Sequence, residues 1–262
     1  MDESTLEELR AAAEARAAFY RTLASLYFKE LDQQGIDRLA AADLAAVDGG
    51  DPLMNEGYAD MAAYLACRDG GTRQELASDF AGAILGAGSY EERRATPFES
   101  VFTSESGLLM QEARDDVYRL LCEAHLAVDE GLRTPEDHLS FEFEYMAVQA
   151  ERLAEALAQG DVGRAARVLD EQRAFHAAHL LNWIDAYCDC LDGCARTRFY
   201  RGVSKVTRGF VHADEALMAE AAVALGVGED ESAEDAVRFG GRAEGVHAVA
   251  GDACGGVAAA VC

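Results

Sequence analysis

One stretch decides the fold of this 262-residue chain: RTPEDHLSFEFEYMAVQAERL, residues 133–153. Its apolar residues recur every three or four positions, the spacing that places side chains on one face of an α-helix. The stripe consists of Leu139, Phe143, Met146, Ala150, Leu153 and Leu157. Thr134 suits the N-cap, Pro135 suits the first helical position, and Asp137 stands where an acid can reach back to the cap amide. We therefore expect a buried helix that begins at Pro135.

A polar line runs along the same predicted helix. It consists of His138, Glu142, Tyr145 and Gln149. The fourth helical position is commonly apolar and packs against the residue before the cap, yet His138 and Arg133 occupy these two places. An N-cap and a buried apolar stripe therefore do not explain the polar line. Judged by spacing alone, a helix cap is the favoured interpretation. A polar line at the start of a helix also suits a functional site.

Helical periodicity extends outward over most of the chain. Ala, Leu, Glu and Arg dominate, there are three prolines, and runs rich in Val, Ile and Thr are scarce, which favours helix over sheet. Further helices are expected at approximately residues 6–35, 36–47, 52–66, 73–85, 108–128, 162–187 and 197–225. The fold class is therefore all-α, a single-domain helical bundle over residues 1–225. Residues 226–262, rich in Gly, Ala and acids, form a flexible C-terminal tail that is disordered or loosely packed.

Charge limits the kind of partner. The chain has 23 basic and 48 acidic residues, a formal net charge of −25, and lacks the basic stripe that nucleic acid requires. Such acidity favours a basic partner and also serves solubility. No apolar run approaches the roughly 18 residues of a membrane span, and the first residues, MDESTLEELR, do not form a secretory signal. Seven cysteines without such a signal indicate a reducing, cytoplasmic location.

The patterns typical of enzymes are missing. A ferritin-like di-iron centre needs two Glu-x-x-His pairs, and of the six histidines only His247, in the tail, has a glutamate three residues before it, Glu244. The sequence has no nucleophile elbow, phosphate-binding glycine loop or GxGxxG before a helix. We expect no catalytic residue and no cofactor. An enzyme that uses His138 remains the alternative.

A cysteine cluster offers the one candidate metal site. Cys188, Cys190 and Cys194 lie close in sequence, and His176 and His179 precede them. Three thiolates and an imidazole could hold zinc, although structural zinc sites usually show paired C-x₂-C spacing. Free cysteines buried in a helix are the commoner case. We expect no metal, and a helical metal-binding protein stays as the alternative.

Several segments, in order, resemble the TorD/DmsD/NarJ family of redox-enzyme maturation chaperones. The most recognisable is a Pro-x-Asp-His at the head of an acidic and aromatic helix. The matching segments are FYRTLASLYF (19–28), LASDFAGAILGAGSYEERRATPFESVFTSESGLLMQ (76–111), TPEDHLSFEFEYMA (134–147), FHAAHLLNWIDAYCDCL (175–191) and FYRGVSKVTRGFV (199–211). The resemblance covers roughly residues 19–211. One departure is AILG, residues 83–86, where many members have Leu-Phe-Gly.

The resemblance implies an all-helical, non-catalytic protein of the cytoplasm. Members bind the precursor of a molybdopterin-containing oxidoreductase subunit, often through its twin-arginine leader. They assist insertion of the cofactor and delay export until folding is complete. A homodimer is compatible with the family, and neither the client nor the oligomeric state follows from the sequence.

Residue by residue, the resemblance transfers partner binding to two motifs and to the helix before them. The expected partner-binding residues are Asp137, His138, Glu142, Tyr145, Phe80, Pro97, Phe98, Glu99, Ser100 and Phe102. In this interpretation Phe80, Phe98 and Phe102 form apolar walls of a groove. Glu99, Asp137 and Glu142 stand as acids at its rim. Such a groove would suit a leader that carries two arginines and an apolar stretch.

Overall fold

A computed structural model describes residues 3–87, 94–129, 131–227 and 259–261. This part of the chain is all-α, as expected, with ten α-helices, one 3₁₀ turn and two short strands. The helices are α1 (Glu3–Phe28), α2 (Gln33–Ala41), α3 (Pro52–Ala66), α4 (Thr72–Ala83), α5 (Glu99–Thr103), α6 (Glu112–Glu123), α7 (Leu139–Ala158), α8 (Val162–His179), α9 (Ile184–Cys194) and α10 (Arg198–Ala224). The 3₁₀ turn is η1 (Leu44–Ala46), and the strands are β1 (Leu126–Val128) and β2 (Ala259–Val261).

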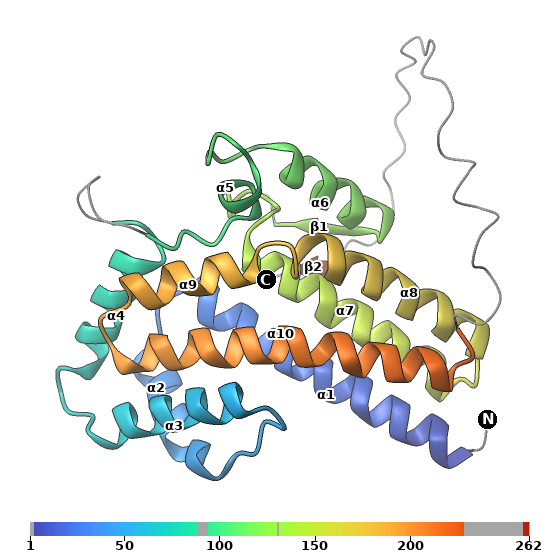
Figure 1. The fold of residues 1–262 in the computed structure, drawn as a ribbon, viewed down its shortest axis with the longest axis horizontal. Coiled ribbons are helices and arrows are strands. Elements are labelled where there is room, and N and C mark those ends of the chain that lie inside the picture. Colours follow the sequence, from blue (N-terminus) through green and yellow to red (C-terminus); the bar gives the residue numbers. More distant parts are fainter. Residues whose placement is uncertain (1–2, 88–93, 130, 228–258, 262) are drawn as a thin grey trace.

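The long helices α1, α7, α8 and α10 form the body of the bundle (Figure 1). The stripe predicted for residues 133–153 and onward to Leu157 is buried along its whole length and packs on α1. The rings of Tyr20 and Tyr27 lie 5.7 Å and 6.2 Å from that of Phe143. Burial of these side chains is the main stabilising contribution of the bundle. The prediction of a buried helix here is confirmed.

A buried charged network ties α1 to α8 and α10. Arg16 Nη2 donates to Asp214 Oδ2 over 2.9 Å, and Tyr20 Oη donates to the same oxygen over 2.6 Å. Arg16 Nη1 donates to Gln172 Oε1 over 2.9 Å. Asp214 is fully buried and Arg16 almost so. Two charges buried at this crossing are tolerated because they pair with each other and because Tyr20 and Gln172 supply further hydrogen bonds.

Helix α3 lies directly against α10, since both helices carry a glycine at the contact. A Cβ atom placed on Gly57 would lie 2.6 Å from the carbonyl oxygen of Gly202. A Cβ atom placed on Gly202 would likewise lie 2.6 Å from the carbonyl oxygen of Gly57. The two backbones can approach this closely only without side chains at these positions.

Some helix boundaries differ from the prediction. The helix expected at Pro135 begins at Leu139, and His138 is its N-cap, with Nδ1 accepting from the Ser140 amide over 3.1 Å. The prediction of Thr134 as the cap is wrong, and the reason lies in tertiary contacts of Asp137 described below. Helices over residues 52–66 and 198–224 agree closely with the prediction.

Two predicted helices are shorter or divided. The one expected over 162–187 ends at His179, and α9 begins after a turn in which the Leu181 amide donates to the His176 carbonyl over 2.9 Å. The one expected over 108–128 is reduced to α6, flanked by a loop and by β1. The helix expected over 36–47 is α2 followed by η1.

The predicted tail falls mostly on residues 228–258, which lie outside the described residues. Residues 259–261 form β2, which pairs in parallel with β1, Leu126 opposite Ala259. The division of the chain at residue 225 therefore stays a prediction. Among the described helices, none has the length and apolar character that a membrane span requires.

Candidate peptide-binding groove

The two sequence motifs meet in space as a backbone clasp. Phe98 and His138 form an antiparallel bridge between the TPFES and PEDH segments. The Leu139 amide donates to the Pro97 carbonyl over 2.9 Å, and the Glu99 amide donates to the Asp137 carbonyl over 3.0 Å. The start of α7 is thereby fixed beside the start of α5.

Asp137 caps α5 rather than its own helix. Its Oδ2 accepts from the Ser100 amide over 2.9 Å, and the side chain is fully buried. Burial raises the pKa of this carboxyl, while the hydrogen bonds from Ser100 act against that rise. An acid at the amino end of a helix satisfies an amide that has no partner within the helix. Since Asp137 is used here, α7 takes the next residue, His138, as its cap.

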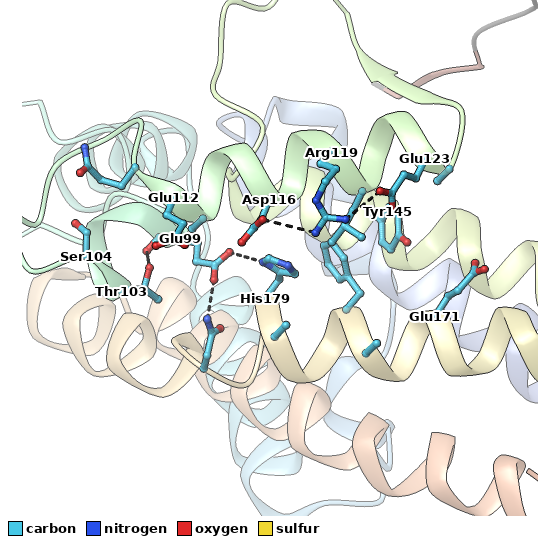
Figure 2. Close-up of a pocket in the computed structure, with 18 of the residues that line it drawn as sticks. Glu99, Thr103, Ser104, Glu112, Asp116, Arg119, Glu123, Tyr145, Glu171 and His179 are labelled. Atoms are coloured by element: carbon cyan, nitrogen blue, oxygen red, sulfur yellow. Dashed lines mark hydrogen bonds and ion pairs between the residues drawn. The ribbon is translucent and has the colours of Figure 1, made fainter. Parts of the chain in front are cut away.

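The clasp places Glu99 beneath an open groove. Glu99 Oε2 accepts from His179 Nδ1 over 2.9 Å, and Oε1 accepts from Asn182 Nδ2 over 2.6 Å (Figure 2). Glu99 is almost fully buried. Both carboxylate oxygens are therefore held by the end of α8 and the turn after it.

Glu142 lies fully buried close to the same clasp. No hydrogen bond to the described residues reaches either of its carboxyl oxygens. Burial raises its pKa well above the ordinary value, and the neighbouring carboxyls of Glu99 and Asp137 raise it further. The charged form is therefore strongly disfavoured in the folded protein.

Glu142→Met is expected to raise the free energy of unfolding at pH 7 by about 1–3 kcal/mol, the usual cost of a buried polar group without a partner. Methionine has a similar length and adapts to its surroundings. The raised folded-state pKa of Glu142 adds a pH-dependent part to this cost, which is absent well below pH 4.5 and grows as the pH rises above that value. Urea unfolding at pH 7 and pH 4.5 measures the difference.

The control is Glu155→Met, an exposed position on the same helix, which is expected to change stability by less than about 1 kcal/mol. A Glu142→Met protein less stable than the wild type at pH 7 would mean that Glu142 has a stabilising partner.

Above the clasp, a groove of about 840 Å³ lies between α6 on one side and α8 on the other. Its floor includes the stacked rings of Tyr145 and Phe175, whose centroids are 4.1 Å apart. Carboxylates dominate its charged lining. They are Glu99, Glu105, Glu112, Asp116, Glu123 and Glu171. An aromatic floor between acidic walls suits a cationic side chain with an apolar stem.

One guanidinium of the chain already lies in this groove. Arg119 Nη1 is 3.0 Å from Glu123 Oε1, and Nη2 is 3.6 Å from Asp116 Oδ1 (Figure 2). The side chain of Arg119 is more than half exposed. Such a surface pair is weak and exchanges readily with other charges. Asp116 and Glu123 of α6 thus already pair with one guanidinium in the groove.

Only part of the predicted site lies in the groove. Glu99 and Tyr145 line it. Asp137 and Glu142, expected at a rim, are buried, so this placement is wrong. The buried His138 is likewise part of the clasp beneath. Pro97 and Ser100 are buried in the clasp as well. Whether the clasp residues take part in partner binding stays a prediction.

The three phenylalanines do not form one wall. Phe80 is buried in α4 and its ring lies 6.0 Å from that of Tyr200 in α10. Phe98 and Phe102 are partly buried. The ring of Phe98 lies 4.9 Å from the imidazole of His138, in the clasp. The Phe102 ring instead packs 5.4 Å from that of Trp183. The three side chains contribute to separate contacts, and none of them lines the groove.

The acids of α6 were not among the residues predicted from the sequence, although their spacing is a readable signal. Glu112, Asp116, Arg119 and Glu123 follow one another at spacings of four, three and four residues. These spacings place all four side chains on one face of a helix. A charged face of this kind is usually only solvated, and it becomes a groove wall because α8 lies opposite.

The cysteine cluster is not arranged as a metal site. Cys188 donates to the Ser204 carbonyl over 3.5 Å, and Cys190 donates to the Arg94 carbonyl over 3.1 Å. Burial raises the pKa of Cys188 to about 12, so its thiol keeps its proton at neutral pH. In the described part of the chain, no three His, Cys, Asp or Glu side chains gather closely enough to hold a metal ion.

The chain matches one protein family and is similar to several proteins named chaperone TorD. A family model described as nitrate reductase delta subunit matches residues 48–189. The chain is 28% identical over 218 residues to the chaperone protein TorD of Vibrio cholerae serotype O1 (strain ATCC 39541 / Classical Ogawa 395 / O395), covering 80% of this chain and 94% of that protein. Identity to TorD of Vibrio parahaemolyticus is 25%, over 81% of this chain and 99% of the relative. Identity to TorD of Shewanella loihica is 27%, over 78% of this chain and 92% of the relative.

Proposed function

Because the chain belongs to the nitrate reductase delta subunit family, we propose that it is a cytoplasmic chaperone for a molybdopterin-containing oxidoreductase. It binds the precursor of the catalytic subunit, assists insertion of the cofactor and delays export until the subunit has folded. The molybdopterin belongs to the client. A non-catalytic role is supported by the similarity to proteins named chaperone TorD.

The observation that carries the proposal is the acidic groove between α6 and α8. A twin-arginine leader presents two guanidinium groups, and each carboxylate can accept two parallel hydrogen bonds from one of them. Glu123 and Glu171 line the part of the groove farther from the loop that precedes α6, and Asp116 lies between them and that loop (Figure 2). Tyr145 lies among them in the floor. The groove thus combines charge and an aromatic surface for the leader.

The net charge of −25 adds long-range attraction for the same leader. This attraction accelerates encounter and is screened at physiological salt, whereas the groove supplies the specific contacts. The clasp contributes indirectly. Asp137 and His138 hold the starts of α5 and α7, and Glu99 thereby reaches the groove floor.

The test is binding of a fluorescent twin-arginine leader peptide, measured by anisotropy at two salt concentrations. Asp116→Lys/Glu171→Lys is expected to weaken binding at least tenfold, because two attractive charges become repulsive. Arg119→Gln is expected to tighten binding, since it frees Asp116 and Glu123 for the arginines of the peptide. A peptide with lysines in place of both arginines is expected to bind more weakly than the leader.

The matched control is Glu7→Lys/Glu14→Lys, which changes the net charge equally on exposed positions of α1. It is expected to reduce binding only slightly. If both double variants lost the same affinity for the leader, the groove would contribute only long-range charge attraction and no specific contacts. No binding of the leader, or of the full precursor, to the wild type would contradict the proposed function.

A further inference from the structure

The connection between α5 and α6 displays three successive apolar side chains. Leu108, Leu109 and Met110 are 62%, 44% and 57% exposed. Single apolar residues are normal on a protein surface, whereas a contiguous group more often marks a site of interaction. We call residues 108–110, at the loop that joins α5 to α6 in Figure 1, the apolar loop.

Hydrogen bonds hold this connection in place. The Gly107 amide donates to the Ser104 carbonyl over 3.2 Å, which closes a turn before the apolar loop. After it, the Gln111 amide donates to Ser100 Oγ over 3.2 Å. The side-chain amide of Gln111 also donates to the Leu109 carbonyl over 2.9 Å. The apolar side chains are thus displayed by a defined backbone, which lowers the entropy lost when a partner binds.

Met110 adopts a backbone conformation that side chains rarely take. Its φ is 61°, in the left-handed region that costs conformational free energy for residues with a Cβ. Strained residues of this kind concentrate at ligand-binding positions. The flexible thioether of methionine adapts to apolar partners of different shapes. An exposed methionine in this conformation therefore fits a role in contacts with a partner.

The apolar loop adjoins the acidic groove at one end. Ser104 and Glu105 before it, and Gln111 and Glu112 after it, line the groove. In Figure 2, Ser104 and Glu112 lie toward one end, and Glu123 lies toward the other. Helix α6 has 12 residues and is about 18 Å long, so its acids lead from the loop along the groove.

Resting on the proposed function, we propose that the apolar loop binds the apolar segment of the client leader while the groove binds its arginines. The leader then lies along α6, with its apolar segment at the amino end of the helix and its arginines toward the carboxyl end. An extended chain advances about 3.3 Å per residue, so about five residues cover the length of α6. A peptide whose arginines and apolar segment are separated by about five residues can therefore occupy the groove and the apolar loop at the same time.

Charge favours the leader over a second copy of this chain as the occupant. A second copy also has a net charge of −25 and would approach a groove lined by six carboxylates. Repulsion between these negative charges opposes association of two copies. A peptide with two arginines next to apolar residues complements both surfaces at once.

The experiment compares two peptides on the full-length protein. The first is the leader, and the second is the same peptide with its apolar segment replaced by serine and glycine. Leu108→Ser/Leu109→Ser/Met110→Ser is expected to weaken binding of the first at least tenfold and to leave the second unchanged. Leu217→Ser, an exposed position of α10, is the matched control and leaves both unchanged. Met110→Gly, which relieves the backbone strain, is expected to weaken binding of the leader alone.

A second measurement locates the peptide directly. A photo-crosslinking residue in the apolar segment is expected to react within residues 104–111, and one beside the arginines is expected to react with α6 or α8. Crosslinks from the apolar segment to other elements overturn the assignment. Undiminished binding of the leader to the triple serine variant also overturns it. A wild-type dimer that this variant dissociates would make the loop a contact between copies instead.

These outcomes separate the inference from the function on which it rests. If the triple serine variant binds like the wild type while Asp116→Lys/Glu171→Lys loses both peptides, the groove stands and the role of the loop is wrong. If neither peptide binds to the wild type, leader recognition itself is contradicted, and the inference is overturned with it.

Discussion

Asp214→Ala is expected to lower the free energy of unfolding by about 3–5 kcal/mol, because it leaves a buried arginine without its countercharge. Arg16 would keep Gln172 as its neutral partner and would remain nearly inaccessible to water. Tyr20 would lose the acceptor of its hydroxyl hydrogen bond. Since this network joins α1, α8 and α10, its disruption affects the whole bundle. Urea unfolding followed by circular dichroism measures the change.

Two comparisons test the physical reason. Asp185→Ala removes an exposed carboxylate that pairs with Arg208 and His212, and it is expected to cost less than about 1 kcal/mol. Arg16→Met/Asp214→Leu removes both buried charges and is expected to recover most of the stability lost in Asp214→Ala. If Asp214→Ala costs no more than Asp185→Ala, the buried pair does not carry the stability assigned to it.

His138→Asn is expected to remove a pH dependence of stability of about 3 kcal/mol. Burial lowers the pKa of His138 from 6.5 to about 4, and its neutral Nδ1 accepts the Ser140 amide as the cap of α7. Between these two pH values the unfolded chain binds a proton that the folded protein does not. The stability due to His138 is therefore complete above pH 6.5 and is lost as the pH falls to about 4. The gap between the two pKa values corresponds to about 3 kcal/mol.

Asparagine is the appropriate replacement because it is a favoured N-cap and does not titrate. The imidazole also packs against the ring of Phe98, so the variant loses some stability at every pH. The readout is the change in the free energy of unfolding between pH 7 and pH 5, compared between variant and wild type. This interval contains about 2 of the about 3 kcal/mol. Glu142 and Asp137 titrate in both proteins, with a sign opposite to that of His138 because their pKa values are raised.

His125→Asn provides the matched control at an exposed position with a φ of 55°, a conformation that asparagine tolerates. It is expected to follow the wild type across this pH range. A His138→Asn protein that loses as much stability as the wild type between pH 7 and pH 5 would show that His138 takes up its proton inside the fold.

Much of the candidate site could not be predicted from sequence, and His138 illustrates why. Thr134 and His138 can both cap a helix, and Pro135 favours the first of them. The choice depends on Asp137, whose carboxylate is used by the Ser100 amide from a segment 37 residues earlier. Local signals contain no information about such a partner. The motif was recognised, while its position at a rim was wrong.

The acids of α6 illustrate the opposite case. Their spacing along the helix is readable from the sequence, but a charged face becomes the wall of a groove only where another element lies opposite. The end of α8 provides that wall, and Glu99 reaches the floor because His179 and Asn182 hold it. The backbone after the apolar loop is likewise held by a residue distant in the sequence, since the Gln111 amide donates to Ser100 Oγ.

The sequence by itself determined the all-α class, the buried stripe from Leu139 to Leu157 and the long helix that follows Thr197. These features depend on contacts within one helix and on the regular spacing of apolar residues, both of which are local. Only the tertiary structure decided which residue caps α7, which carboxylates are buried and which of them line a groove. Caps, burial and grooves depend on which distant segments come together, and a linear pattern of residues does not specify that.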